Sequence, residues 1–158
     1  MSTSDHADGV RNRLLRLGAA VAVGAGMLTA TGCGQDSGCE HTALELVPAT
    51  FTGLDDPLTL RATLTSDGAP LADFRLIFSA VVTGPKDLVG KSGQALSRLA
   101  YVMTDTNGVA TYTTSSGIGE QLLPMQTPIG YDVSLITANP INGKYYCDTR
   151  ESANFVSG

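Results

Sequence analysis

The sequence predicts an all-β domain, a single antiparallel β-sandwich of seven to eight short strands, placed after an N-terminal targeting segment. The 158 residues include 18 glycines and seven prolines but no tryptophan, a composition typical of a turn-rich β protein. Short segments in which apolar and polar residues alternate follow one another along residues 42–158, with turn sequences between them. No segment there has a convincing helical period, and the length suits one domain.

The first expected strands occupy residues 43–47 and 58–65. Residues 43–47 are mostly apolar and end at Pro48. In residues 58–65, leucine or alanine alternates with threonine or arginine, which predicts a strand that buries one face. The small and polar residues 66–70 follow and predict a turn.

The next expected strand is the apolar segment 71–82. One face carries an apolar residue at every second position, at Leu76, Phe78, Ala80 and Val82. Ile77 and Val81 lie on the other face, so we expect neighbouring groups to cover both sides of this strand. Residues 84–97 break the alternation and predict a loop.

Two further strands are expected at 99–104 and 109–113. Between them, Asn107-Gly108 predicts a tight hairpin, because both residues tolerate the positive φ that such a turn needs. A second long loop is expected over residues 115–128.

The last expected strands follow this loop. Residues 131–137 alternate in polarity, residues 139–143 predict a turn, and residues 144–147 begin a last strand. A segment near 152–156 is long enough to close the edge of a sheet. Tyr131 begins its strand, and we expect its hydroxyl to bond upstream backbone as in a tyrosine corner, with an aromatic binding contact as the alternative.

Residues 1–32 have the features of an export signal. Three arginines precede an apolar stretch from Leu17 to Ala30, which is 14 residues long. A membrane-spanning helix needs about 20 apolar residues, so this stretch fits the apolar part of a signal peptide better. We expect residues 1–32 to be a cleaved signal, 33–41 a short tether, and 42–158 the folded domain.

The end of this segment resembles that of a bacterial lipoprotein precursor. Ala30-Thr31-Gly32-Cys33 is a box of small residues before a cysteine. In that family the cysteine is thioether-linked to diacylglycerol and becomes the new N-terminus. The resemblance implies lipidation of Cys33 and anchoring to the outer face of the bacterial plasma membrane or to the outer membrane, since two acyl chains anchor a protein stably. The alternatives are ordinary secretion with Cys33 incidental, and a cytoplasmic N-terminal helix.

Cys39 and Cys147 are left as a pair if Cys33 carries the lipid. Export favours a disulfide between them, which would close nearly the whole mature chain into one loop. The alternative is a metal site built from Cys39, His41 and Cys147, although structural zinc normally has four ligands in closely spaced pairs. We expect the disulfide and no metal.

Residues 57–138 resemble a bacterial immunoglobulin-like domain of the invasin and intimin type. The most specific part is Thr104-Asp105-x-Asn107-Gly108-Val109-Ala110-Thr111, which related prealbumin-like modules share. The other matching positions are Leu58, Leu60, Ala62 and Leu64, then Asp67-Gly68, Pro70-Leu71-Ala72, Phe74, Leu76 and Phe78, and finally Tyr131 and Val133. The long segments 84–97 and 115–128 and the cysteine pair depart from that family, so the resemblance implies the fold and no particular binding surface.

The sequence indicates no catalytic residue and no cofactor. His41 is the only histidine after residue 32, and no serine stands in a nucleophile motif. The adjacent Asp55 and Asp56 could hold calcium with Asp105 or Asn107, but the spacing of a calcium-binding loop is absent.

The expected function is therefore a membrane-anchored, non-catalytic module for surface binding or structural support. Residues 33–158 carry seven Lys and Arg against thirteen Asp and Glu, a net charge of −6, which excludes a basic nucleic-acid surface. Leu122, Leu123 and Met125 form a candidate binding loop for a protein or cell-envelope partner. A small exported enzyme using acidic residues or His41, and a metal-binding lipoprotein, are the alternatives.

Overall fold

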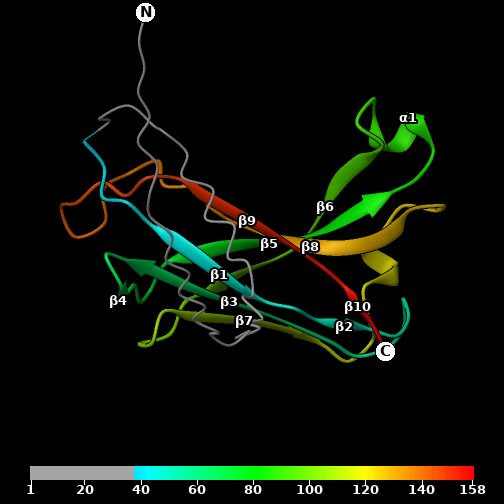
Figure 1. Cartoon of the computed structure of the whole chain (residues 1–158), viewed down its shortest axis with the longest axis horizontal. Coiled ribbons are helices and arrows are strands. Elements are labelled where there is room, and N and C mark those ends of the chain that lie inside the picture. The colour runs from blue at the N-terminus through cyan, green and yellow to red at the C-terminus, as the bar shows by residue number, and fades with distance from the viewer. Residues whose placement is uncertain (1–37) are drawn as a thin grey trace, which may run out of the picture. The chain divides into compact units, whose positions relative to one another are not determined.

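The computed structural model describes residues 38–158, and the predicted signal peptide and Cys33 lie outside the described residues. The described part is an antiparallel β-sandwich (Figure 1). It has seven strands of five residues or more, a number within the predicted seven to eight: β1 (Ala43–Val47), β3 (Leu58–Ser66), β5 (Arg75–Thr83), β6 (Gln94–Met103), β7 (Val109–Thr114), β8 (Thr127–Leu135) and β9 (Thr149–Asn154). The shorter elements are β2 (Thr50–Phe51), β4 (Ala69–Pro70), β10 (Val156–Ser157), the helix α1 (Lys86–Val89) and the 3-10 helix η1 (Gly119–Gln121). Within residues 38–158, no helix combines the length and the apolar character that a membrane crossing requires.

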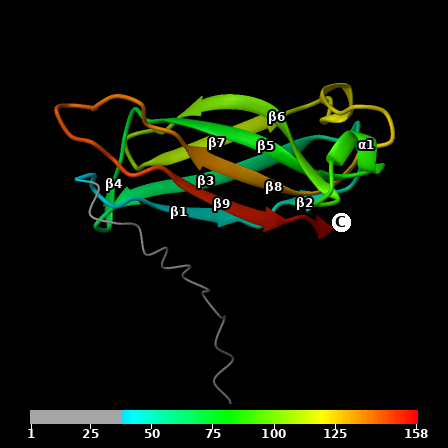
Figure 2. The ribbon, with the colours of Figure 1, turned by 90° about the horizontal axis from the view of Figure 1, so that it is seen from above.

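Two sheets form the sandwich (Figure 2). In the β3 sheet, β3 lies between β1 and β7, and β4 extends the sheet by a hairpin with β3. In the β5 sheet, the strand order is β6-β5-β8-β9. A division of consecutive strands between two antiparallel sheets in this way is immunoglobulin-like. The short strands β2 and β10 form a separate parallel pair.

The core lies between the sheets and follows the predicted alternation. Its largest contributions come from β3, β5 and β8, whose inward side chains are at most 2% exposed: Leu58, Leu60, Ala62 and Leu64, then Leu76, Phe78, Ala80 and Val82, and Tyr131, Val133 and Leu135. Burial of a leucine or phenylalanine side chain stabilises the fold by about 1.5–3 kcal/mol. Truncation of Phe78 to alanine would therefore cost about 3–5 kcal/mol, because a cavity would also remain.

Residues 71–74 are not part of β5, which corrects the predicted start of that strand. The backbone at Asp73 has φ 64°, a left-handed conformation that no regular strand contains. The Thr104 hydroxyl donates to the Leu71 carbonyl at 2.6 Å and accepts from the Phe74 amide at 2.9 Å. The Thr104 side chain thus satisfies the Leu71 carbonyl and the Phe74 amide, two groups that a regular strand would pair through its backbone.

Residues 94–97 belong to β6, so the loop predicted over 84–97 is shorter and contains α1. These residues pair with Ala80 to Thr83 of β5. The segment Gln-Ala-Leu-Ser has little intrinsic β propensity, and its partner strand decides its conformation.

The Asn107-Gly108 turn forms, but it is not a hairpin between paired strands, which corrects the prediction. Gly108 has φ 73°, and Asn107 is not among the residues of positive φ. The Asp105 carboxylate accepts hydrogen bonds from the amides of Asn107 and Val109 at 2.8 and 2.9 Å, which stabilises the turn locally. The chain then crosses from the β5 sheet to the β3 sheet, where β7 pairs with β3.

A hairpin of the predicted geometry occurs instead at Asp67-Gly68. These residues have φ 49° and 79°, and they join β3 to β4 with Ser66 opposite Ala69. Two successive residues of positive φ match a type I′ turn.

The last long strand is β9, so the strand predicted from residue 144 is wrong. Lys144 instead closes a small turn around Asn142-Gly143 through two backbone bonds with Ile141, 2.9 and 3.0 Å long. Tyr146 forms an isolated parallel bridge with Glu40. The segment 144–147 is therefore paired with the beginning of the domain and not with β8.

Candidate functional site

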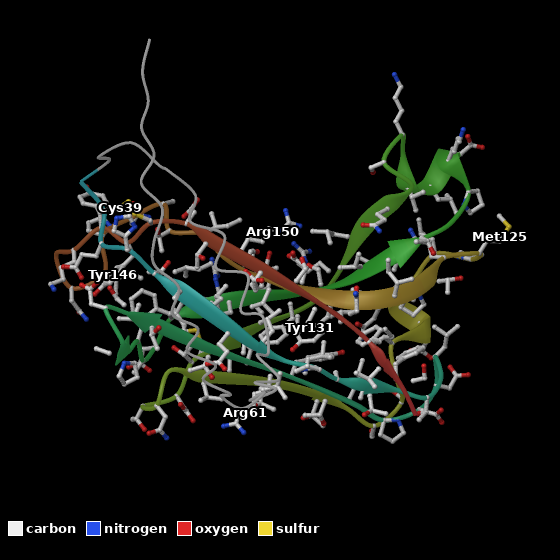
Figure 3. The ribbon with its side chains drawn as sticks, viewed as in Figure 1. Cys39, Arg61, Met125, Tyr131, Tyr146 and Arg150 are labelled. Carbon is white, nitrogen blue, oxygen red and sulfur yellow. A yellow bond between two sulfur atoms is a disulfide. The ribbon has the colours of Figure 1, made fainter. Side chains whose placement is uncertain are left out.

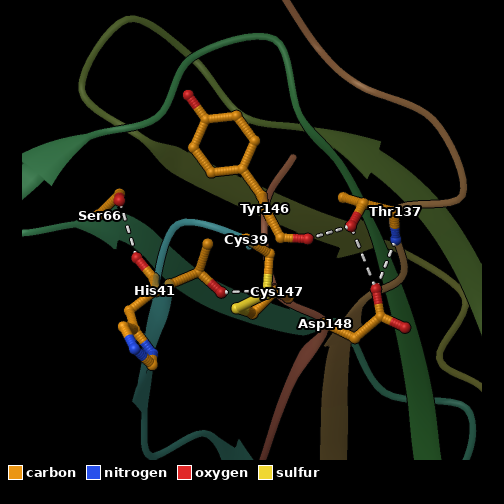
Figure 4. Close-up of a disulfide and its surroundings, with 8 residues drawn as sticks. Cys39, His41, Ser66, Thr137, Tyr146, Cys147 and Asp148 are labelled. Carbon is orange, nitrogen blue, oxygen red and sulfur yellow. Dashed lines mark hydrogen bonds between the residues drawn. A yellow bond between two sulfur atoms is a disulfide. The ribbon is translucent and has the colours of Figure 1, made fainter. Parts of the chain in front are cut away.

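The predicted disulfide is present at one end of the sandwich, where Figure 3 labels Cys39, and Figure 4 shows it in close-up. Cys39 and Cys147 are bonded across a sequence separation of 108 residues, with their Cα atoms 5.1 Å apart. Both sulfur atoms are used in this bond, so neither is a thiolate ligand, and the metal site considered as the alternative at these cysteines is not formed. Within residues 38–158, no three His, Cys, Asp or Glu side chains lie together as a metal site would require.

Hydrogen bonds hold the same two segments together beside the disulfide. The Glu40 amide donates to the Tyr145 carbonyl at 2.7 Å, and the Cys147 amide donates to the Glu40 carbonyl at 2.9 Å. The Thr42 hydroxyl donates to the Cys147 carbonyl at 2.9 Å. The Lys144 ammonium lies 2.7 Å from the Glu40 carboxylate, and this hydrogen bond raises the pKa of Lys144. The start of the domain is thereby attached to a segment more than 100 residues later.

His41 is exposed and takes part in this structure through its backbone. The Ser66 hydroxyl donates to the His41 carbonyl at 2.7 Å, and not to the imidazole (Figure 4). The contact therefore has none of the geometry of a serine–histidine catalytic pair, in which the ring nitrogen takes the hydroxyl proton.

The acidic residues considered for calcium lie at opposite ends of β3. Asp55 precedes the start of the strand, whereas Asp105 lies in the turn next to its end, where the Leu64 amide donates to the Gly108 carbonyl. The six residue-to-residue steps from Leu58 to Leu64 already span about 20 Å of extended chain. One ion cannot therefore bind both carboxylates.

Tyr131 has the expected structural role, but its partners are not those of a tyrosine corner. Its hydroxyl lies 2.6 Å from the Val47 carbonyl and 3.1 Å from the Arg61 carbonyl, 84 and 70 residues upstream. These carbonyls belong to the opposite sheet, and Figure 3 shows Tyr131 between the two layers. Burial raises the pKa of Tyr131 to about 12, although both backbone hydrogen bonds act in the opposite direction.

The candidate binding loop lies at the end of the sandwich opposite Cys39, as the labels of Met125 and Cys39 in Figure 3 show. Leu122 is half-buried against the core, whereas Leu123 is 55% exposed and Met125 is 74% exposed. The predicted trio is therefore divided between a packing residue and two surface residues.

The backbone of this loop holds Met125 in an unfavourable conformation. The Gln126 amide donates to the Leu123 carbonyl at 3.1 Å, which closes a turn with Pro124 and Met125 as its central residues. Met125 has φ 68°, the position where a type II turn normally has glycine. The Gln126 side chain, itself buried, accepts from the Leu123 amide at 3.0 Å and holds the turn.

A second surface, which the residue spacing does not predict, is the outer face of the β5 sheet. We call it the arginine face and define it by Arg75, Leu96, Arg98, Tyr101, Met103 and Arg150. All six residues are exposed. The three apolar or aromatic ones have 45–53% of their surface accessible. Arg150 extends outward from β9 in Figure 3.

One buried carboxylate organises part of this face. Asp132 on β8 is 2% exposed, and its Oδ2 accepts from Arg150 Nε at 2.7 Å and from the Ser152 hydroxyl at 2.8 Å. An open hollow of about 290 Å³ lies beside it, with Val81, Ala95 and Leu96 as apolar lining. The hollow is at the lower limit for a small-molecule site and is suited to a single side chain.

Two arginines flank an aromatic ring on the same face. The guanidinium carbons of Arg75 and Arg98 lie 5.1 and 5.0 Å from the centre of the Tyr101 ring. Arg98 Nη1 also donates to the Tyr101 hydroxyl at 2.7 Å. Cation–π contacts of this kind hold the guanidinium groups in place while they remain exposed.

A β-bulge brings Arg98 and Tyr101 to one side of β6. Residues three apart in a regular strand point to opposite faces. In β6, Arg98 pairs with Ser79 and Ala100 pairs with Phe78, so Leu99 is an extra residue that reverses the alternation. The sequence carries no local signal of this bulge, and the arginine face could not be derived from the spacing of its residues.

No protein-family model matches the chain, and no curated protein matches it.

Proposed function

We propose that this protein is an exported bacterial lipoprotein, anchored through lipid on Cys33, whose immunoglobulin-like domain is a non-catalytic binding module. The order of arginines, apolar stretch and small-residue box before Cys33 supports export and lipidation. The Cys39–Cys147 disulfide supports an oxidising compartment.

The observation that carries the binding role is the position of the Leu123–Gln126 turn. Cys39 follows Cys33 by only six residues, which reach at most about 20 Å. The Cys39 end of the domain would therefore stay near the membrane, and the turn at the opposite end would face away from it.

The conformation of Met125 favours binding over structural support alone. A non-glycine residue of positive φ costs about 1–2 kcal/mol, and residues held in this way are concentrated at functional sites. The exposed Met125 side chain makes no large contribution to the core that would offset this cost. We infer that the turn presents Leu123 and Met125 to a protein or other cell-envelope partner.

The anchor is tested by the intact mass of the protein extracted from membranes, before and after reduction and alkylation. We expect a chain that begins at Cys33, carries acyl groups, and gains two alkyl groups only after reduction. The Cys33→Ala variant is the control and should lack the acyl mass. A chain that retains Met1, or one without lipid, would contradict the proposed anchor.

The binding role is tested by photo-crosslinking on intact cells. A photoreactive residue at position 125 should give one defined adduct, and the same residue at Thr111, exposed on β7 of the β3 sheet, should not. Leu123→Asp should abolish the adduct without unfolding the domain. Equal labelling from both positions, or none from position 125, would refute binding at this turn while leaving the anchor unaffected.

A further inference from the structure

We propose that the arginine face binds an acidic polypeptide segment that carries apolar side chains between its carboxylates. This surface is separate from the Leu123–Gln126 turn, and the proposal does not depend on the lipid anchor. Three features of the described residues lead to it: charge, fixed guanidinium groups, and exposed apolar side chains.

The charge of this face is opposite to that of the rest of the domain. Residues 38–158 contain seven Lys and Arg and twelve Asp and Glu, and three of the seven cations are Arg75, Arg98 and Arg150. The β5-sheet strands place one carboxylate on this face, Asp132, which Arg150 and Ser152 already bind. The remaining positive charge favours a ligand with carboxylates.

The guanidinium groups are held in place before a ligand binds. Arg75 and Arg98 both stack near the Tyr101 ring, and Arg98 is also hydrogen-bonded to its hydroxyl. Side chains that are already ordered lose less conformational entropy on binding. A planar guanidinium can also bind a carboxylate through two parallel hydrogen bonds.

The apolar residues distinguish a polypeptide from other polyanions. Leu96, Tyr101 and Met103 are 45%, 50% and 53% exposed beside the arginines. An acidic polysaccharide would pair with the arginines but would have no aliphatic side chains to cover the apolar residues. The hollow beside Leu96 has space for one such side chain. Tyrosine, arginine and methionine are also enriched at protein interfaces.

The segment is expected to lie on the face and not to extend the sheet at its edge. The edge strand β6 is bulged at Leu99, and the Ser97 hydroxyl donates to the Gln121 carbonyl of η1 at 2.9 Å. Bulges and covering segments both disfavour the addition of a strand to a sheet edge.

The test measures binding of the full-length protein in detergent to a fluorescent synthetic peptide of alternating Glu and Val, by fluorescence anisotropy. We expect saturable binding that weakens with salt, and much weaker binding of the matched Gln and Val peptide. The double variant Arg75→Gln/Arg98→Gln should bind the acidic peptide at least about tenfold more weakly. The matched control Lys86→Gln/Lys91→Gln removes two exposed cations from the loop containing α1 and should change the affinity less than about twofold.

Four results would overturn the proposal. The first is binding of the Gln and Val peptide as tight as that of the acidic peptide, and the second is an equal loss of peptide affinity in the two double variants. The third is binding of polygalacturonate as tight as that of the acidic peptide. The fourth is self-association of the protein that the arginine substitutions abolish. The last two would identify a polysaccharide or a second copy as the occupant. The variant Met125→Asn should bind the peptide with the wild-type affinity. A failure of peptide binding at the arginine face is therefore distinguishable from a failure of the Leu123–Gln126 turn as a binding site.

Discussion

The hydroxyl of Tyr131 on β8 lies 2.6 Å from the carbonyl oxygen of Val47, the last residue of β1, and so joins the two sheets through a partly buried hydrogen bond. The same hydroxyl oxygen lies 3.1 Å from the carbonyl oxygen of Arg61, which is its second acceptor. Val47 and Arg61 are partners in the β1–β3 ladder, so the tyrosine binds the last pair of that ladder.

Substitution of Tyr131 by phenylalanine should destabilise the domain by about 1–3 kcal/mol at neutral pH. The change removes little apolar contact, but it leaves two carbonyls at a partly buried position without their hydroxyl partner. Urea unfolding of the wild type and the variant measures the difference. Equal unfolding free energies would show that the hydrogen bond contributes nothing.

The same tyrosine should make stability fall at high pH. The pKa of Tyr131 is about 12 in the folded domain and about 10 when unfolded, so only the unfolded state loses this proton between the two values. The contribution of this proton to the free energy of unfolding is fully present below about pH 10. It is lost as the pH rises through 12, and the total loss is about 2–3 kcal/mol at most. The difference between wild type and Tyr131→Phe should therefore narrow over that window. A constant difference would contradict the raised pKa.

Loss of the disulfide should lower the free energy of unfolding substantially. Its closed loop of more than 100 residues predicts a loss of about 4–5 kcal/mol in the double variant Cys39→Ser/Cys147→Ser. Chemical unfolding with and without reductant measures this loss. Cys33→Ser is the control and should unfold like the wild type, and a double variant as stable as the wild type would refute the prediction.

Relief of the backbone strain at Met125 should stabilise the domain. Asparagine tolerates positive φ better than methionine, so Met125→Asn should raise the unfolding free energy by up to about 1 kcal/mol. Leu122→Asp should lower it, because Leu122 packs against the core. A loss of stability in Met125→Asn would show that the methionine contributes to packing.

The buried carboxylate of Asp132 should be needed for stability. Asp132→Asn weakens two charge-assisted hydrogen bonds, to Arg150 and Ser152, and should cost about 1–3 kcal/mol in urea unfolding. Asp87→Asn, at an exposed position, is the matched control and should change stability by less than about 0.5 kcal/mol. Equal effects of the two substitutions would show that burial and pairing of Asp132 do not matter.

Several features of the fold were predictable because their signals are local. The apolar segment that ends at Pro48 is β1 with the expected bounds, and the alternation of residues 58–65 is the core of β3. The disulfide was predictable because compartment and cysteine number limit the pairing. The apolar loop sequence did not predict that Leu123 and Met125 are exposed while Leu122 is half-buried.

By itself the sequence determined most of the segments that become strands and the positions of the tight turns, because period-two polarity and turn propensity belong to short stretches of chain. It also left Cys39 and Cys147 as the expected pair, because export favours a disulfide. Tertiary structure alone decided which strands pair. The turn at Gly108 joins different sheets, and the extra residue Leu99 brings Arg98 and Tyr101 onto one face. It also decided that Tyr131 bonds to Val47. These outcomes depend on how two apolar sheet faces fit together, which involves contacts between residues far apart in the chain.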